Sequence, residues 1–458
     1  MKIKNISLLP LLASAVILLN TSCRFEEDEY FDQSASLRVT TTNEELKSLL
    51  VKQSSDANNG WVIQYFVGGT DEADFEGFNL FGRFYDNGKV LLASDHRYLR
   101  NGNANKYTEA TSFYQITPEE GTLLSFPIWN DVLSVFADPV DPSSAPGSLV
   151  GDGVGMNGDY NLVLSSFKND TIVFRGQRHQ AEARFLKCDR SWQDYIAAVN
   201  DLKQKISNTY LTSYYVTTGD TVRYFSDLNT GVIAYTERVN NPLDKQTVTC
   251  VFTTKGFRLN HVTKLGENSF QEFTLDEANG KLYSEDGKTT VIPCWDNYVV
   301  DCPSDWRLDP DAFTTAQKEL FEKMAVEVQK VNSQYVLDSI MIGRPVETIE
   351  DGSQQAFPAL LVYIHGPKKM GRTPIYKPYI YMDITKPEFG VVTFSASSET
   401  KTSDFMKNFE GTDLKSLCEQ FAATLYGTYQ IKVNNYFHPV SAELTPSTTG
   451  NPVKLRMK

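Results

Sequence analysis

Histidine, the side chain best suited to proton transfer at neutral pH, is scarce in this sequence of 458 residues. Its positions are His96, His179, His261, His365 and His438. No HExxH pair places two imidazoles on one helix face to bind zinc, and no GxSxG turn presents a nucleophilic serine. The sequence therefore identifies no catalytic residue, no metal ligand and no cofactor-binding residue, and it predicts a non-catalytic protein without a cofactor.

Two loops have the composition of a ligand site without the context that such a site needs. GVGMNG, at residues 153–158, has the glycine spacing of a dinucleotide-binding loop, which requires a strand before it and a helix after it. Here a loop rich in Pro and Ser precedes it, and a predicted strand follows. DEADFEG, at residues 71–77, gathers four carboxylates but lacks the ligand order of an EF-hand. We interpret the first as a hairpin entry and the second as a solvated acidic loop.

The segment HGPKKMGRTPIYKP, at residues 365–378, concentrates positive charge in an otherwise acidic chain. It lies between two predicted strands and could bind an anionic ligand or an acidic partner, or it could be an exposed hairpin with ordinary lysines. Two tyrosines follow on one strand face, where they could form a platform for a sugar or peptide or could fill a core. The candidate ligand or partner residues are Lys368, Lys369, Arg372, Tyr376, Lys377, Tyr379 and Tyr381.

The N-terminal residues predict export and lipid attachment. An apolar stretch at residues 6–19 follows two lysines and is shorter than the roughly 20 residues that cross a bilayer. The residues before Cys23 resemble the lipobox of bacterial lipoproteins, although Asn20 occupies a position that is usually apolar. We therefore predict a signal peptide over residues 1–22 and a lipidated Cys23, with ordinary secretion and cleavage elsewhere as the alternative.

Residues 23–35 form a predicted acidic tether between the lipid and the folded protein. Their acidic run also resembles the signal that exports lipoproteins of Bacteroides-type bacteria to the cell surface. The expected location is the outer membrane, with the lipid-anchored protein facing the cell exterior.

Export would make two further modifications possible. Cys294 and Cys302 flank a short segment that a disulfide could close, because an envelope compartment permits disulfides. Three short sequences resemble the acceptor motif of the O-glycosylation system of Bacteroides-type bacteria. Their candidate acceptor residues are Thr171, Thr221 and Ser339.

Composition and patterning predict a β-rich α+β fold. A hydrophobic content of 41% suits a packed globular chain, and a formal net charge of -13 argues against nucleic-acid binding. Many short alternating strands, such as those flanking the turn at Asn87-Gly88, indicate antiparallel barrel-like or sandwich-like sheets with a few packing helices. Thr42 and Thr314 are expected to cap two of these helices. We predict two domains, over residues 36–208 and 209–458, with a possible sub-boundary near 301–312.

Several segments together resemble one family of unknown function, numbered 4302, whose members are lipoproteins of Bacteroides-type bacteria. The segments are YFDQSASLRV, NGWVIQYFVGG, FNLFGRFYDNGKV, SFYQITPEEGTLLSFPIWNDVLSVFADP and GDYNLVLSSFKNDTIVFRGQRH. The resemblance runs from about Phe25 to Cys188. It implies genes encoded beside Sus-like outer-membrane uptake pairs, and it carries over no catalytic residue.

The expected function is therefore a surface-exposed, non-catalytic accessory of a Sus-like nutrient uptake system, which binds a glycan, a peptide or the uptake proteins. One alternative is an unrecognised hydrolase of glycans or peptides, which would need a cleft where carboxylates or histidines converge. A second alternative is a fimbrial or adhesive subunit, which would need an exposed groove or a detachable strand.

Overall fold

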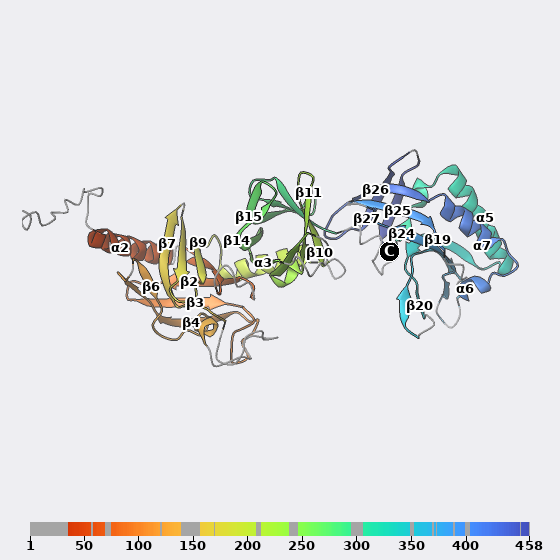
Figure 1. Ribbon diagram of the computed structural model, residues 1–458. Coiled ribbons are helices and arrows are strands. Elements are labelled where there is room, and N and C mark those ends of the chain that lie inside the picture. The colour runs from red at the N-terminus through yellow and green to blue at the C-terminus, as the bar shows by residue number, and fades with distance from the viewer. Residues whose placement is uncertain are drawn as a thin grey trace, which may run out of the picture.

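The computed structural model describes residues 35–55, 58–68, 75–119, 121–138, 156–168, 170–207, 212–237, 246–294, 306–348, 352–368, 371, 373–387, 390–398, 404–448 and 450–457. Within these ranges three large antiparallel sheets follow one another along an elongated molecule (Figure 1). The first has nine strands, the second is a closed barrel of eight, and the third curls into a ring. The predicted β-rich α+β fold with barrel-like antiparallel sheets is therefore confirmed.

The first sheet has the strand order β4-β3-β2-β1-β9-β8-β7-β6-β5. Its strands are β1 (Trp61–Phe66), β2 (Phe78–Phe84), β3 (Lys89–Ser94), β4 (Thr108–Phe113), β5 (Gln115–Thr117), β6 (Leu123–Ser125), β7 (Asn161–Lys168), β8 (Thr171–Gly176) and β9 (Glu182–Lys187). The predicted turn at Asn87-Gly88 joins β2 and β3. Between β6 and β7 lies a short 3-10 helix, η1 (Ser134–Ala137).

Helix α2 (Ala35–Gln53) covers one face of this sheet by packing against β2 and β5. It buries Leu46 and Leu50 against a core that contains Trp61 of β1. The helix begins before Thr42, so the predicted cap at that residue was wrong. Thr42 instead lies inside the helix.

The barrel joins consecutive strands from β10 to β17 and closes by pairing β10 with β17. Its strands are β10 (Ser213–Thr218), β11 (Thr221–Ser226), β12 (Val232–Thr236), β13 (Gln246–Phe252), β14 (Gly256–Leu265), β15 (Asn268–Asp276), β16 (Lys281–Ser284) and β17 (Thr289–Pro293). A short 3-10 helix, η3 (Leu228–Thr230), connects β11 and β12.

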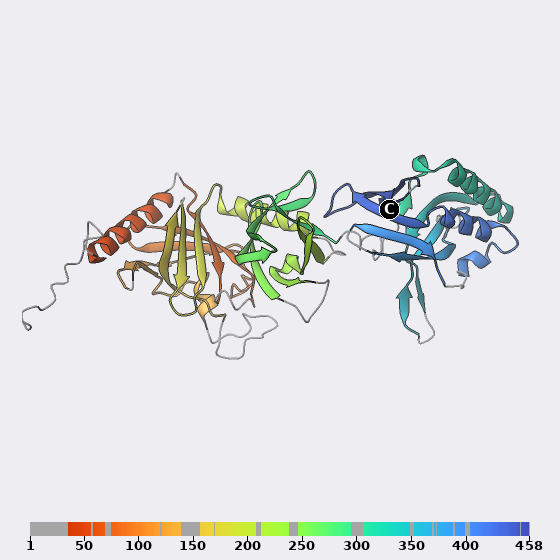
Figure 2. The ribbon, with the colours of Figure 1, turned by 45° about the horizontal axis from the view of Figure 1, so that its top comes forward.

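Helix α3 (Trp192–Ile206) lies between the first sheet and the barrel (Figure 2). Ser191 caps it by accepting a hydrogen bond from the backbone N–H of Asp194. Its apolar face joins one hydrophobic core that contains Val62 and Phe81 from the sheet and Phe225 from the barrel. Strand β1 is consequently buried on both faces, because α2 covers one and α3 with the barrel covers the other.

The third sheet closes because β19 pairs with both β18 and β22. Its strands are β18 (Trp306–Leu308), β19 (Val336–Gly343), β22 (Ala359–His365), β23 (Ile375–Tyr376), β24 (Tyr379–Thr385), β25 (Val391–Ala396), β26 (Gly427–Val433), β27 (Ser441–Pro446) and β28 (Val453–Met457). A separate hairpin joins β20 (Val346–Thr348) and β21 (Gln354–Ala356).

Three helices accompany the third sheet: α5 (Thr315–Val331), α6 (Asp404–Lys407) and α7 (Leu414–Ala423), with a 3-10 turn, η4 (Pro310–Ala312). The predicted cap of α5 is confirmed, since Thr314 and Gln317 form a reciprocal capping box. Helix α7 packs against α5 and against β22, β24 and β25. Among the described residues, no helix has both the length and the apolarity needed to cross a membrane. The predicted boundary at 208/209 lies outside the described residues.

Candidate functional site

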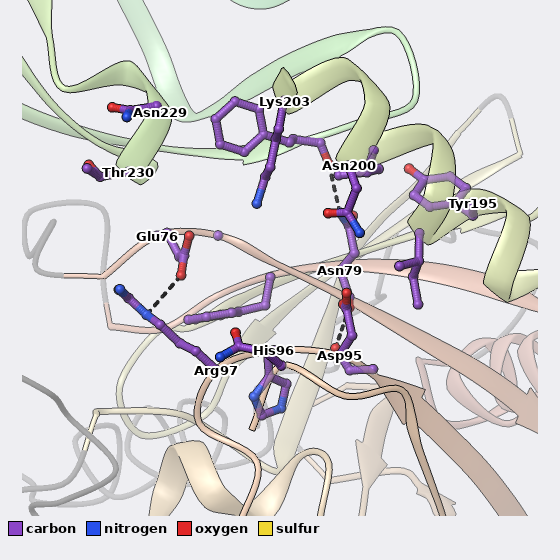
Figure 3. Close-up of a pocket in the computed structure, with 17 residues that line it drawn as sticks. Glu76, Asn79, Asp95, His96, Arg97, Tyr195, Asn200, Lys203, Asn229 and Thr230 are labelled. Atoms are coloured by element: carbon purple, nitrogen blue, oxygen red, sulfur yellow. Dashed lines mark hydrogen bonds and ion pairs between the residues drawn. The ribbon is translucent and has the colours of Figure 1, made fainter. Parts of the chain in front are cut away.

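A cavity of about 450 Å³ opens where the first sheet, α3 and the barrel meet (Figure 3). This volume is within the range of roughly 300–1,000 Å³ that is usual for small-molecule sites. The sheet contributes residues before and within β2 together with the connection that follows β3. One face of α3 forms a second wall, and η3 and the end of β13 form the barrel's part of the lining. We name this space the junction cavity.

Glu76 reaches the junction cavity from a short segment that is pressed between the sheet and the barrel. The N–H of the next residue, Gly77, donates a hydrogen bond of 3.0 Å to the carbonyl of Cys250 in β13. On the other side lies Gly231, whose φ of 78° suits glycine and where an added Cβ would stand 2.7 Å from Cβ of Glu76. The backbone of the barrel thus fixes the position of this carboxylate.

Arg97 is the ion-pair partner of Glu76, with 3.1 Å between its Nε and the carboxylate Oε1. Its guanidinium lies over the ring of Tyr98, 5.0 Å from the ring centre. Burial raises the pKa of Glu76 above its usual value, and the positive charges of Arg97 and Lys203 only partly oppose this rise. The effect of desolvation on the pKa of Glu76 is therefore larger than the effect of its ion pair with Arg97.

Asp95 and Lys203 bring a second pair of opposite charges from different walls of the cavity. Lys203 extends from α3 toward the sheet, with its ammonium 4.7 Å from the ring centre of Phe252 (Figure 3). Asp95 follows β3, and burial raises its pKa, while a hydrogen bond from its own backbone N–H and the charge of Lys203 lower it. Among the described residues neither group forms an ion pair within 4.0 Å.

Asn79 of β2 presents an unsatisfied acceptor at the same site. Its side-chain Nδ2 donates a hydrogen bond of 2.7 Å to the carbonyl of Phe252, which ties the sheet to the barrel. Its Oδ1 is buried and has no hydrogen-bond partner among the described residues. Such a buried acceptor is costly unless water or a ligand donates to it. Further polar side chains line the cavity, namely Asn105, Asn200, Asn229 and Thr230.

His96 also borders the cavity, but its ring nitrogens are both engaged inside the protein. Its Nδ1 accepts a hydrogen bond from the N–H of Tyr98, and its Nε2 therefore carries the proton that is donated to the carbonyl of Val132. Burial lowers the pKa of His96 to about 4. This neutral imidazole supports the connection after β3 and has no nitrogen left for proton transfer.

The chemistry that this arrangement supports is the recognition of a small polar molecule. The walls offer cationic donors, carboxylate acceptors and amides, together with the apolar faces of Phe252 and Ile196. Within the described ranges, no three His, Cys, Asp or Glu side chains gather closely enough to hold a metal ion.

The predicted basic loop is not part of this site. Lys369 and Arg372 lie outside the described residues, and Lys368 is exposed. Lys377 places its ammonium 4.7 Å from the ring centre of Tyr363, and the ring centre of Tyr376 is 5.3 Å from that of Tyr335.

Tyr379 and Tyr381 are each only 8% exposed and share a small core with Tyr363. Tyr379 also donates a hydrogen bond from its hydroxyl to Glu347 of β20. Burial, more than this carboxylate, raises the pKa of Tyr379. Of the two alternatives for these tyrosines, the core is therefore confirmed and the platform is excluded.

The predicted modification sites differ in accessibility. Cys23 and Cys302 lie outside the described residues, and Cys294 is buried. Thr221 is exposed and Thr171 is half-buried, so glycosylation of either stays a prediction. Ser339 is only 1% exposed and donates to Asp338, so its hydroxyl is inaccessible to a glycosyltransferase once the chain has folded.

Sequence reasoning missed the junction cavity, although it had noticed one of its residues. Glu76 belongs to the acidic stretch 71–77, which was interpreted as a solvated loop, and the structure shows that this interpretation was wrong for Glu76. Its side chain is only 17% exposed because the barrel covers it. The sequence contains no local signal for this burial, since Arg97 and Lys203 come from distant parts of the chain.

Comparison with known protein families gives one match. The family model described as a domain of unknown function, DUF4302, matches residues 27–277. No curated protein matches the chain. The matched segment contains the whole first sheet, α3 and every wall of the junction cavity. Because the match covers more than half of the sequence, the chain belongs to the DUF4302 family.

Proposed function

We propose that this protein is a lipid-anchored, non-catalytic binding protein of the outer cell surface, which captures a small polar ligand in the junction cavity. In this role it serves as an accessory of a Sus-like outer-membrane uptake system, and its ligand is a glycan or peptide fragment. The leader that ends at Cys23 and the acidic tether support the location. The match to DUF4302 supports the context only through the resemblance of its members to surface lipoproteins.

The single observation that carries the binding role is a cavity of about 450 Å³ whose walls present Lys203 and Asp95, neither of which has an ion-pair partner within 4.0 Å among the described residues. Asn79 lines the same cavity, and its Oδ1 is buried with no donor among the described residues. The amide is held in place by its own Nδ2 hydrogen bond to Phe252. Two opposite charges held on separate elements are a preorganised feature, which lowers the cost of binding a ligand of complementary charge.

An array of glycans and peptides, probed with the full mature chain, tests this proposal. We expect binding without turnover, and we expect Asn200→Leu and Thr230→Val to weaken it, because both residues line the cavity. Gln193→Leu is the matched control, since Gln193 lies on α3 but does not border the cavity. Binding that is unaffected by both cavity variants would refute the assignment to this site.

A hydrolase is the second candidate, and one specific observation favours it. Glu76 and Asp95 border the same cavity, and burial raises the pKa of both carboxyls. Carboxyls of this kind can act as a general acid and its partner. Each array hit is therefore also incubated with the protein and analysed for products. Cleavage that is lost in both Glu76→Gln and Asp95→Asn would replace the non-catalytic proposal with this one.

A further inference from the structure

We propose that the ligand of the junction cavity is a zwitterionic dipeptide, whose carboxylate pairs with Lys203 and whose ammonium pairs with Asp95. This inference rests on the proposed binding function and names its ligand class. It follows from the distribution of charge between the walls of the cavity.

The four charged groups of the cavity are not equivalent. Glu76 and Arg97 already satisfy one another at 3.1 Å. Lys203 and Asp95 have no such partner within 4.0 Å among the described residues, and they come from opposite walls, α3 and the end of β3 (Figure 3). The cavity thus presents one available cation and one available anion on its two sides.

A ligand that fills the cavity excludes water from these two charges. A neutral molecule would leave the ammonium of Lys203 and the carboxylate of Asp95 desolvated and attracted to one another only across the cavity, with no ion-pair partner within 4.0 Å among the described residues, which is unfavourable. A ligand with a single charge would compensate only one of them. A zwitterion compensates both and keeps the cavity electrically neutral.

The remaining walls fit the rest of such a ligand. The side-chain oxygens of Asn200 and Thr230, which line the cavity, can accept a hydrogen bond from an ammonium or a peptide N–H. Ile196, Val199 and Phe252 provide an apolar surface for an aliphatic side chain. The ring of Phe252 also holds Lys203, which directs the ammonium into the cavity instead of toward bulk solvent.

Isothermal titration of the full mature chain with glycyl-L-leucine, its methyl ester and its N-acetyl derivative tests the inference, with maltose as a neutral probe. We expect glycyl-L-leucine to bind, and we expect either blocked end to weaken binding at least about tenfold. Lys203→Met should weaken the parent dipeptide by a similar factor and should remove the difference between parent and ester. Asp95→Asn should likewise weaken binding of the parent dipeptide and should remove the difference between the parent and the N-acetyl derivative. Lys205→Met is the control, because Lys205 lies on α3 but pairs with Glu277 outside the cavity.

Equal binding of the parent and both blocked dipeptides would overturn the inference, and so would the absence of any dipeptide binding. Binding of maltose that Lys203→Met and Asp95→Asn leave unchanged but Asn200→Leu weakens would also overturn it. That last result would leave the proposed binding function intact, so failure of the ligand class and failure of the site are distinguishable.

Discussion

The Nε of Arg97 lies 3.1 Å from the carboxylate of Glu76, joining the connection after β3 to the segment before β2. The carboxylate is 17% exposed and the guanidinium side chain is 43% exposed, so burial falls mainly on the acid. This asymmetry explains why the pKa of Glu76 is raised although a cation is in contact with it. The charged form of Glu76 is maintained at a cost to the stability of the folded protein.

Glu76→Gln should therefore raise the stability of the folded protein at neutral pH. A carboxyl whose pKa is higher in the folded state destabilises that state once it ionises, so the stability that Glu76 contributes falls as the pH rises from the ordinary carboxyl range through the raised pKa. Thermal unfolding of both proteins between pH 4 and pH 7 measures the effect. The variant should have the higher melting temperature at pH 7, and the difference should shrink toward pH 4. A difference that is constant with pH would contradict this account.

Gly231→Ala should displace the segment that carries Glu76. The residue has a φ of 78°, and an added Cβ would lie 2.7 Å from Cβ of Glu76. Gly219→Ala is the matched control, because Gly219 also has a positive φ, of 54°, but has no atom within 4 Å of an added Cβ. We expect a loss of about 1–2 kcal/mol of unfolding free energy for the control, from backbone strain alone. We expect a clearly larger loss for Gly231→Ala, measured by chemical denaturation. Equal losses would show that the contact between the added Cβ and Glu76 costs no stability beyond the backbone strain.

His96→Gln should reduce the loss of unfolding free energy that the protein undergoes at acidic pH. The pKa of His96 falls to about 4 in the folded state because the imidazole is buried, whereas an unfolded histidine titrates near about 6.5. The unfolded chain consequently binds a proton that the folded protein does not, and stability is lost as the pH falls from about 6.5 toward 4. Full loss of this contribution amounts to about 3 kcal/mol. Denaturation curves at pH 7.5 and pH 5 should show a smaller decrease for the variant than for the wild type, and an equal decrease would refute the prediction.

Most predictions that depend on neighbouring residues were correct, whereas contacts between distant segments were not predicted. The capping box of Thr314 and Gln317 and the turn at Asn87-Gly88 depend on neighbouring residues, and both were predicted correctly. The cap predicted at Thr42 was also a local signal, but α2 continues through it. Propensity at one residue cannot outweigh a helix that packs along a sheet.

The candidate site could not be predicted, because it is made by contacts between distant segments. Lys203 enters the cavity because α3 packs between two sheets, and alternation within strands does not reveal which sheet covers which face. The same limit applies to Tyr379 and Tyr381, whose shared strand face was predicted without any means of deciding that it is buried. The spacing of these two tyrosines in the sequence is compatible both with an exposed binding platform and with a buried core.

Arg258 of β14 and Glu182 of β9 form a largely buried ion pair between the barrel and the first sheet, and its rupture should be strongly destabilising. Arg258 Nη2 lies 2.8 Å from Glu182 Oε1, and the two side chains are 8% and 12% exposed. Removing Arg258 leaves the buried carboxylate of Glu182 with only the longer contact of 3.8 Å to Arg175 Nη2, so Arg258→Met should cost up to about 3–5 kcal/mol of unfolding free energy. Lys205→Met, which breaks the solvent-exposed pair with Glu277, should cost far less stability.

The double variant Arg258→Met/Glu182→Met separates the loss of attraction from the cost of an uncompensated charge. Replacing both ions by apolar side chains of similar length removes the uncompensated charge, so most of the stability lost in Arg258→Met should return. Urea denaturation of the single and double variants provides both values. If the double variant is no more stable than Arg258→Met, the pair contributes through packing of the Arg258 stem against its neighbours, and the electrostatic account is refuted. If stability returns but ligand binding does not, the charges of this pair hold the sheet and the barrel in the relative position that the junction cavity requires.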